Sequence, residues 1–265
     1  MLIFGGTGML GHAMHRVLAA APGLQVEATR RAAVDAENPA DLARAFDAAR
    51  PALVINCVGL VKQREEAEDR AAAEPINALL PHRLAALCRV GGARLIHFST
   101  DCVFSGRKGD YSEDDLPDPV DVYGETKLEG EVAGPGLLTL RTSMIGPELR
   151  GRLGLLEWFL AQKGPVKGYA RAIFSGLPTV ELARIVRDHV IPNAGLDGLC
   201  HVSADPISKL DLLRLFAAEY GHEIEIVADG KVAIDRSLDS SRFRAATGYV
   251  PPAWPALVAQ MRAFG

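Results

Sequence analysis

The chain has 265 residues, of which 48% are hydrophobic and 23% are charged, the balance of a packed globular protein rather than a disordered one. A net charge of −4 and a pI of about 6.0 argue against nucleic acid or an acidic membrane surface as a partner. No apolar run reaches the ~18 residues of a membrane span. Without a basic leader and cleavage site, a cytoplasmic location is expected.

The first half of the chain alternates predicted strands with predicted helices. Strands are expected at 2–4, 25–29, 52–59, 94–100 and 137–143, and helices at 11–21, 38–50, 77–91 and 122–133. The run "ALVINCVG" (52–59) resembles a strand buried on both faces. This alternation predicts an α/β fold, a doubly wound parallel Rossmann sheet with right-handed crossovers.

After about residue 147 the alternation becomes less regular. Helices are predicted at 153–162, 180–190, 208–220 and after Trp254, and strands at 199–203 and 223–227. We therefore predict an NADP-binding Rossmann domain over 1–146, rejoined by elements near 177–203. Residues 147–176 and 204–265 are predicted to form a smaller, interleaved substrate-binding lobe, with Trp158 anchoring its core.

A glycine-rich loop lies between the first predicted strand and helix. In "MLIFGGTGMLGHAM", Gly5, Gly6, Gly8 and Gly11 match both G-x-x-G-x-x-G and G-x-G-x-x-G. Such glycines permit a tight turn, close approach of a pyrophosphate and close packing of helix on strand, while the helix N-terminus supplies N–H groups. In this strand–loop–helix context the motif predicts dinucleotide binding.

The end of the second predicted strand indicates which dinucleotide binds. NAD sites usually carry an acidic residue there, whereas this chain has Arg30 and Arg31, which suit a 2′-phosphate. NADP(H) is therefore favoured, with NAD(H) as the alternative. The two arginines could equally be ordinary solvated side chains. Asp35 is placed to reach the adenine edge.

Residues at the end of the third strand are also expected near the cofactor. Cys57, Val58 and Gly59 follow this strand, and strand ends line the ligand crevice at the switch point of such sheets. Cys57 itself is expected to be a small buried residue rather than a nucleophile. The four cysteines have no close pair, so no metal site is predicted.

Tyr123 and Lys127 are four residues apart in "VYGETK", on one face of a predicted helix. A nearby ammonium and an oxidised nicotinamide ring would stabilise phenolate and lower the tyrosine pKa, making Tyr123 a usable general acid. Thr100, in "FSTDCVF", would hydrogen-bond the substrate oxygen. A surface Tyr–Lys pair at helical spacing is the alternative.

Taken together, these segments resemble the extended short-chain dehydrogenase/reductases, within them the dTDP-4-dehydrorhamnose reductase group. The resemblance rests on GGTGMLG, "STDCVFSG", "YSEDDLPDPVDVYGETKLEGE", "LRTSMIG", "SGLPTVELA" and "LDSSRF…TGY", and covers nearly the whole chain. It departs at Cys102, where this group usually has a tyrosine, and at 60–78.

The resemblance implies a catalytic set of Thr100, Tyr123 and Lys127. The cofactor-binding set is then Gly5, Gly8, Met9, Leu10, Gly11, Arg30, Arg31, Asp35, Cys57, Val58, Gly59, Asn77, Ser99, Tyr123, Lys127 and Ser143. The substrate-binding set is Thr100, Asp101, Cys102, Lys167, Arg171, Arg236 and Asp239.

The implied activity is NADPH-dependent reduction of the 4-keto group of a nucleotide-linked 6-deoxy sugar in cell-surface polysaccharide biosynthesis. The substrate would be dTDP-4-dehydrorhamnose or a UDP-linked amino-sugar analogue, and a homodimer is a candidate assembly. A nucleotide-sugar epimerase or dehydratase is an alternative, disfavoured because Cys102 stands where a dehydratase wants glutamate. A non-catalytic NADP-binding regulatory subunit is another.

Overall fold

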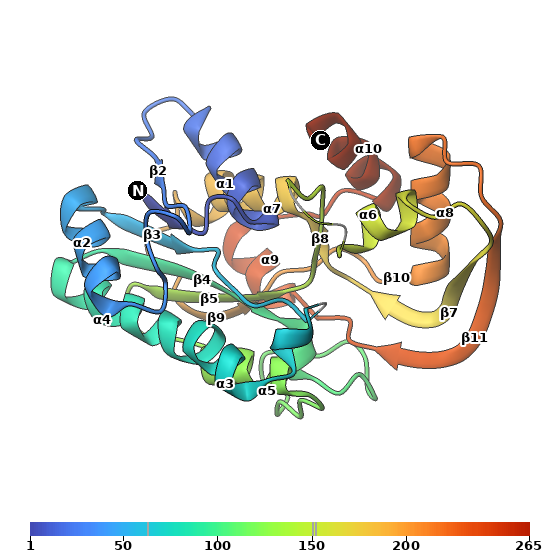
Figure 1. Cartoon of the computed structure of the whole chain (residues 1–265), viewed down its shortest axis with the longest axis horizontal. Helices are drawn as coiled ribbons and strands as arrows, with labels where there is room; N and C mark the ends of the chain where they lie inside the picture. Colours follow the sequence, from blue (N-terminus) through green and yellow to red (C-terminus); the bar gives the residue numbers. More distant parts are fainter. Residues whose placement is uncertain (63, 150, 152) are drawn as a thin grey trace.

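The computed structural model describes residues 1–62, 64–149, 151 and 153–265. Its central sheet has six parallel strands in the order β2-β1-β3-β4-β5-β9 (Figure 1). The strands are β1 (Leu2–Phe4), β2 (Glu27–Ala28), β3 (Leu53–Asn56), β4 (Arg94–Thr100), β5 (Leu137–Thr142) and β9 (Gly198–His201). The predicted fold class is confirmed. The strand order reverses at β1, so a ligand crevice is expected at the carboxyl ends of β1 and β3.

Helices cover both faces of this sheet. In Figure 1, α1 (Met9–Ala19) and α7 (Thr179–Ile185) lie above it, and α4 (Leu80–Gly91) and α5 (Val122–Glu129) lie below. Helix α2 (Pro39–Ala49) lies at the left end and shares a core with α4. Alternate residues of a strand face opposite sides, so Ile3 packs in the upper core while Leu2 and Phe4 pack in the lower one. Burial on both faces explains why the central strands are continuously apolar.

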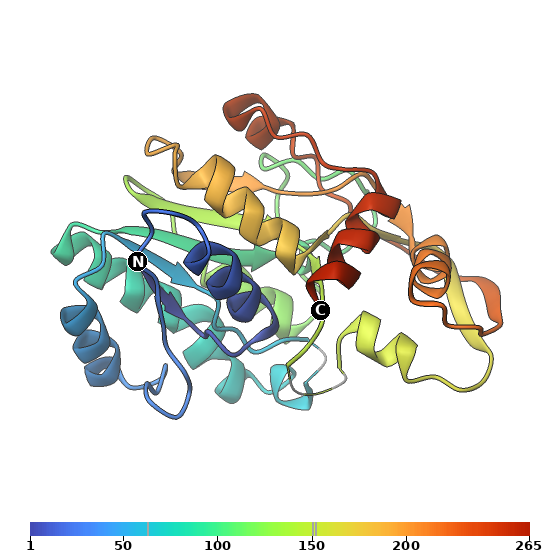
Figure 2. The same cartoon turned by 90° about the horizontal axis from the view of Figure 1, so that it is seen from above.

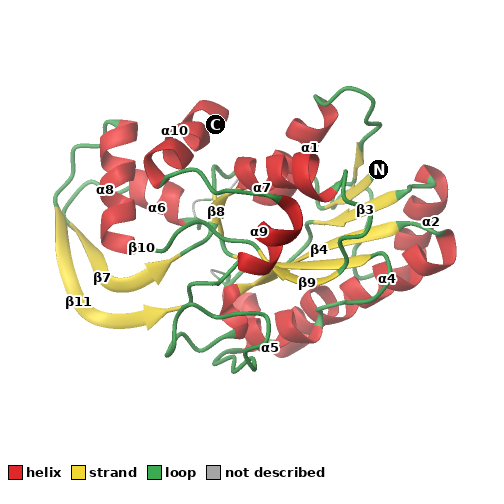
Figure 3. Cartoon of the chain, turned by 180° about the vertical axis from the view of Figure 1, so that it is seen from behind, coloured by secondary structure: helices red, strands yellow, loops and turns green. Residues whose placement is uncertain are grey.

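A second, smaller sheet has the order β10-β7-β11 and lies beside the carboxyl ends of the central strands (Figures 1 and 3). Its strands are β7 (Val166–Phe174), β10 (Ile207–Ser208) and β11 (Ile226–Asp235), and a short pair is formed by β6 (Met144–Ile145) and β8 (Leu177–Pro178). The helices of this half are α6 (Leu155–Leu160), α8 (Lys209–Tyr220), α9 (Ser241–Thr247) and α10 (Trp254–Phe264).

One apolar core connects the two sheets. A single cluster of buried side chains contains Ile3 and Met14 of the first half together with Phe159, Phe216 and Met261 of the second. Figure 2, seen from above, shows α10 between α7 and α8. This shared core fixes the small sheet against the edge where ligands are expected, although the division into lobes at residue 146 stays a prediction.

The main differences from the predicted elements are in two segments. No helix or strand is predicted from the sequence over 164–176, whereas 166–174 forms the strand β7. The helix predicted from residue 77 begins earlier, with α3 (Arg70–Ala73), and passes through a π-helical turn (Glu74–Leu79) into α4. Prolines 75 and 81 are tolerated because each lies in the first turn of its segment. Within the described ranges, no helix is long and apolar enough to cross a membrane.

Candidate active site

The glycine loop forms a tight turn between β1 and α1. Gly5 has a φ of +85°, a conformation that favours glycine, and the N–H of Gly8 donates to its carbonyl at 3.0 Å. A Cβ on Gly11 would lie 2.1 Å from the Gly5 oxygen, so only glycine lets the helix approach the loop this closely. Gly8 is the N-cap of α1, and no side chain caps the first turn of this helix, so the N–H groups of Met9 and Leu10 have no side-chain partner among the described residues.

The residues predicted to select the cofactor follow β2. Arg30 and Arg31 are both exposed, and neither forms a salt bridge with any other described residue. The neighbouring Asp35 carboxylate accepts the backbone N–H of Glu37 at 3.0 Å, so it is partly engaged in its own turn. The β2 end is fixed to the glycine loop, because the N–H of Gly6 donates to the Thr29 carbonyl at 2.9 Å.

The loop after β3 is held by buried amides. The Asn77 side chain accepts from the Leu60 N–H at 2.9 Å and donates to the Leu60 carbonyl at 3.1 Å, and it also reaches Thr126 of α5 at 3.4 Å. Asn77, predicted to contact the cofactor, therefore positions this loop, which includes Val58 and Gly59. Burial raises the pKa of the Cys57 thiol, in agreement with an inert packed cysteine.

Helix α5 brings Tyr123 and Lys127 to the end of β4. Asp121 caps the helix by accepting the Gly124 N–H at 2.8 Å, which fixes the start of the helix and places Tyr123 in its first turn. One turn later the buried Lys127 ammonium donates to the carbonyl of Phe98 in β4 at 2.6 Å. This hydrogen bond fixes α5, and with it Tyr123, beside the strand that carries Thr100.

Thr100 lies at the carboxyl end of β4 and caps the short 3₁₀ turn Asp101–Val103. Its hydroxyl accepts the Cys102 N–H at 3.1 Å and donates to the Asp101 carboxylate at 3.2 Å. The Tyr123 phenol lies near Thr100, close enough for the Thr100 hydroxyl to lower its pKa. Because a hydroxyl has one hydrogen, a substrate oxygen would compete with Asp101 for the hydrogen of Thr100.

The pKa of Tyr123 is raised in the protein without a bound dinucleotide. Burial raises it, and the nearby Cys102, Asp101 and Asp121 raise it further, while the neighbouring Thr100 hydroxyl lowers it. The predicted lowering requires the Lys127 ammonium together with an oxidised nicotinamide ring, and it stays a prediction. The raised pKa keeps the phenol protonated at neutral pH, which is the form that can give up a proton.

Lys127 is a buried cation whose pKa is lowered to about 8. Burial is the cause, because it disfavours the charged form, and the carboxylate of Glu131 partly offsets it. Glu131 lies one helical turn beyond Lys127 in the sequence and is held by two partners. It accepts from Ser99 at 2.6 Å and from Arg141 at 2.7 and 2.8 Å.

Two serines predicted to bind the cofactor are placed differently. The Ser99 hydroxyl is buried and serves Glu131. Ser143, half-buried just after β5, offers its carbonyl to Leu177, whereas its hydroxyl has no partner among the described residues. Ser143 is therefore the better placed of the two to bind a ligand, and a cofactor contact by either serine stays a prediction.

The residues predicted to bind substrate divide into two groups. Arg236 lies near the carboxyl end of β4, donating to the Phe104 carbonyl at 2.7 Å and lying 3.8 Å from the Cys102 sulfur. Lys167 is 3.6 Å from the Asp229 carboxylate and also lines a cavity in the small lobe. Arg171 is exposed outside that lining, and the Asp239 carboxylate accepts from Ser241 at 2.8 Å. A binding role for Arg171 or Asp239 has no support from these contacts.

Several residues at the site were missed by sequence reasoning. Lys209 is half-buried near Asp101, Cys102 and Arg236, yet in the sequence it only follows Ser208, an ordinary helix cap. Lys62 forms an ion pair with Asp121, within a stretch that departs from the expected pattern. No spacing in the sequence points to either lysine, because folding alone brings them to the end of β4.

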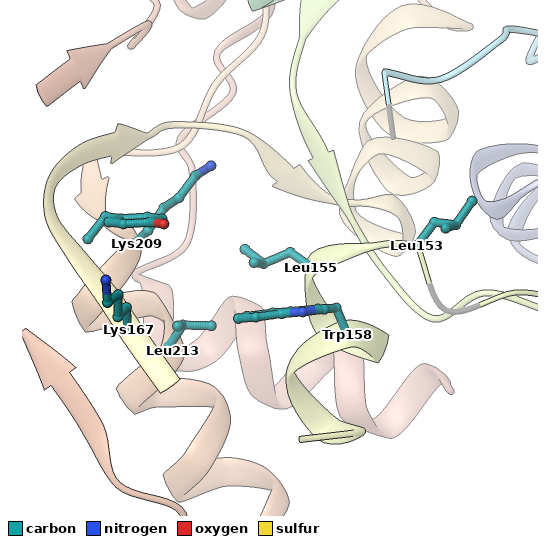
Figure 4. Close-up of a pocket in the computed structure, with 7 residues that line it drawn as sticks. Leu153, Leu155, Trp158, Lys167, Lys209 and Leu213 are labelled. Atoms are coloured by element: carbon teal, nitrogen blue, oxygen red, sulfur yellow. The ribbon is translucent and has the colours of Figure 1, made fainter. Parts of the chain in front are cut away.

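Trp158 corrects another expectation. It does not anchor the lobe core but is 39% exposed and lines the small-lobe cavity. Its side chain lies on α6 beside Leu155, as Figure 4 shows. Across the described ranges, no group of three or more His, Cys, Asp or Glu side chains is arranged to hold a metal ion.

The parallel sheet, the glycine loop at its switch point and the Tyr–Lys helix beside β4 define the fold of Rossmann-type reductases and epimerases. The chain belongs to the family described as the RmlD substrate binding domain, whose profile matches residues 1–152. The family resemblance predicted from the sequence is thereby confirmed.

Curated relatives match the chain over about half of its length. A dTDP-4-dehydrorhamnose reductase of Burkholderia thailandensis is 35% identical over 150 residues, which are 55% of this chain and 50% of the relative. The dTDP-4-dehydrorhamnose reductase of Escherichia coli K12 is 37% identical over 143 residues, 50% of this chain and 46% of the relative. The matched region thus spans about half the length of these relatives.

Solved structures match the fold over the whole chain. A dTDP-4-dehydrorhamnose reductase from Bacillus anthracis, in complex with NADP, has a TM-score of 0.87 at 20% identity, covering 100% of this chain and 98% of that one. The Bordetella bronchiseptica enzyme WbmG, in complex with NAD and UDP, has a TM-score of 0.78 at 19% identity, covering 99% and 93%. At these identities the likeness concerns the fold.

Proposed function

We propose that the protein is an NADPH-dependent reductase of the 4-keto group of a nucleotide-linked 6-deoxy sugar, acting in cell-surface polysaccharide biosynthesis. The observation that carries the proposal is the proximity of the Thr100 and Tyr123 hydroxyls at the carboxyl end of β4, on the same sheet edge as the glycine loop. Two hydroxyls at one point can bind one carbonyl oxygen, one by donating a hydrogen bond and the other by giving up its proton.

The chain's own residues fit a dinucleotide. The α1 N-terminus, without a side-chain cap, suits a pyrophosphate, and Arg30 and Arg31 suit a 2′-phosphate because they are exposed and form no salt bridge within the described ranges. The reduced nicotinamide, when bound, supplies a hydride. NAD(H) stays as the alternative cofactor.

Each catalytic residue then has a stated part in the reaction. Thr100 orients the keto oxygen and polarises it, and Tyr123, kept protonated by its raised pKa, donates the proton. Lys127, fixed to Phe98 one helical turn after the tyrosine, supplies positive charge as phenolate forms. Asp101, whose pKa is raised by burial, accepts the Thr100 hydrogen between turnovers.

Turnover with defined substrates tests the proposal. Loss of the absorbance of NADPH should accompany reduction of dTDP- or UDP-linked 4-keto-6-deoxy sugars, and Tyr123→Phe should lower kcat by about 10²–10⁴-fold while NADPH still binds. Sugar turnover without net oxidation of added cofactor would instead indicate an epimerase. Binding of NADPH without any turnover would indicate a regulatory subunit.

Cofactor choice is tested separately. Arg30→Ala should reduce the preference for NADPH over NADH by about tenfold or more, since a charge-assisted hydrogen bond to phosphate is lost. Arg89→Ala, another exposed arginine, is the matched control and should leave the preference unchanged. The expected homodimer and cytoplasmic location belong to the same proposal, and light scattering after size-exclusion chromatography would measure the former.

A further inference from the structure

An ion pair connects the loop after β3 to the start of the catalytic helix. The Lys62 ammonium, in the loop, donates to the carboxylate of Asp121, the N-cap residue of α5. Neither residue has a part in the reaction described so far, although Tyr123 follows Asp121 by two positions. In the described part of the chain, no other cation forms a salt bridge with Asp121. The pair therefore links a loop expected to lie near the cofactor with the helix that carries the proton donor.

A second contact holds the same segment against α5. Arg70, the first residue of α3, donates to the Glu125 carboxylate at 3.1 Å and also pairs with Glu129, both on α5. In Figure 1, α3 lies beside α5. Lys62 and Arg70 thus fasten the segment to this helix at two points, and Lys62 contacts the end of the helix at which Tyr123 lies.

The Asp121 carboxylate has a partner for each of its oxygens. Oδ1 accepts the Gly124 N–H at 2.8 Å, and Oδ2 accepts the Lys62 ammonium. Burial alone would raise the pKa of Asp121, but the hydrogen bonds from Lys62 and Gly124, together with the charge of Lys62, outweigh burial and lower that pKa. The carboxylate is therefore ionised at neutral pH, and Lys62 both fixes its orientation and offsets its charge.

The charge of Asp121 matters because of its effect on Tyr123. Burial raises the pKa of the phenol, and Cys102, Asp101 and Asp121 raise it further. The cations near the phenol or near these neighbours come from α5, the loop after β3, α8 and the end of β11, and they are Lys127, Lys62, Lys209 and Arg236. A paired carboxylate acts on its surroundings as a dipole, whereas an unpaired one acts as a full negative charge that opposes phenolate formation. Without Lys62, the phenol would be a weaker acid.

We propose that Lys62 is a positioning residue for proton transfer, which holds the Asp121 carboxylate at the start of α5 and offsets its charge. The inference rests on the proposed function in taking Tyr123 as the proton donor. Lys62 acts through Asp121 rather than on the substrate, because its ammonium is already bound to that carboxylate. The side chains of Lys62 and Asp121 are 42% and 27% exposed, so the effect should be modest and should weaken with added salt.

A double-mutant cycle measures the role of Lys62. Lys62→Gln should lower kcat for reduction of a 4-keto sugar by about threefold and leave KM for NADPH unchanged, since one partly exposed charge changes the acidity of the phenol only moderately. Lys62→Arg should restore kcat. In Asp121→Asn the amide still caps the helix but no longer holds a cation, so Lys62→Gln should have no further effect in that background.

Lys108→Gln is the matched control. It breaks an ion pair of similar exposure, 54% for Lys108 and 24% for Asp115, and should leave kcat unchanged.

The ionisation of Tyr123 provides a readout that needs no turnover. Phenolate absorbance, taken as the difference between each protein and its Tyr123→Phe counterpart in the presence of NADP⁺, follows the titration of this one phenol. The midpoint should lie about half a pH unit higher in Lys62→Gln than in the parent, because an unpaired carboxylate opposes phenolate. The difference should disappear in the Asp121→Asn background.

An unchanged kcat or an unchanged midpoint in Lys62→Gln would overturn the proposal. A raised KM for NADPH would also overturn it, because Lys62 would then bind the cofactor. The two proposals fail separately. If the parent reduces no 4-keto sugar while the midpoint shifts through Asp121, the reductase proposal fails and the role of Lys62 at the phenol stands. If the parent reduces 4-keto sugars and Lys62→Gln behaves like Lys108→Gln, the reductase stands and the role of Lys62 fails.

Discussion

Two buried cations, Arg141 of β5 and Lys127 of α5, are stabilised in opposite ways. Arg141 is 3% exposed, donates to Glu131 at 2.7 and 2.8 Å and lies over the Phe104 ring with 5.2 Å to its centroid. Lys127 is 5% exposed, and among the described residues it forms no salt bridge, only the hydrogen bond to the Phe98 carbonyl.

The difference in partners distinguishes a charge that stabilises the fold from a charge that serves the reaction. A buried ion with a full set of partners contributes to one arrangement of the fold and has no capacity left for a ligand. A buried ion without a carboxylate partner destabilises the fold, so it is expected where its charge is needed for another purpose. We therefore assign Arg141 to the architecture of the site and Lys127 to its chemistry.

The largest effect is expected for Arg141→Met, which leaves the Glu131 carboxylate poorly paired. Loss of the Arg141 guanidinium should lower the free energy of unfolding by about 3–5 kcal/mol, as for other broken buried ion pairs. Urea denaturation followed by circular dichroism measures it. Removing both charges, as Arg141→Met with Glu131→Gln, should recover part of the loss. If the free energy of unfolding of Arg141→Met lay within about 1 kcal/mol of that of the parent, the structural role assigned to Arg141 would be contradicted.

The glycine loop, the strand–helix alternation and the Tyr123–Lys127 spacing could be predicted because each depends on residues close together in the sequence. The Arg141–Glu131 pair could not, because a loop between α5 and β5 brings the partners together. The position of Lys209 could not be predicted either. In the sequence it is only the first residue of a helix, and folding brings it near Asp101 at the end of β4. Trp158 was misjudged because helical periodicity does not distinguish a core face from a cavity wall.

An intermediate effect, of opposite sign, is expected for Lys127→Met. Burial lowers the lysine pKa from 10.5 to about 8, which corresponds to a penalty of about 3 kcal/mol at neutral pH. Loss of the hydrogen bond to the Phe98 carbonyl destabilises the variant by about 1 kcal/mol and offsets part of this gain. The free energy of unfolding of Lys127→Met should therefore be about 2 kcal/mol higher than that of the parent at pH 7. Reductase activity should fall by about a hundredfold or more.

The pH dependence provides the control for Lys127→Met. Below pH 8 the lysine is charged in both folded and unfolded chains, so the parent carries the full penalty. Between about 8 and 10.5 the folded protein has released this proton while the unfolded chain still holds it, so the parent gains stability as pH rises. The advantage of Lys127→Met should shrink across this window. An advantage independent of pH would mean that packing, not charge, causes it.

The smallest effects are expected for two serines, and they test whether the structural network around Glu131 is separate from cofactor binding. Ser99→Ala removes one bond to Glu131 and should lower the free energy of unfolding by about 1 kcal/mol, leaving KM for NADPH unchanged. Ser143→Ala, whose hydroxyl has no partner in the described part of the chain, should instead leave stability unchanged and raise that KM about fivefold. If Ser99→Ala raised KM for NADPH while stability stayed the same, Ser99 would face the cofactor, as the sequence alone suggests. Ser99 would then belong to the cofactor site, and only Arg141 would remain as a structural partner of Glu131.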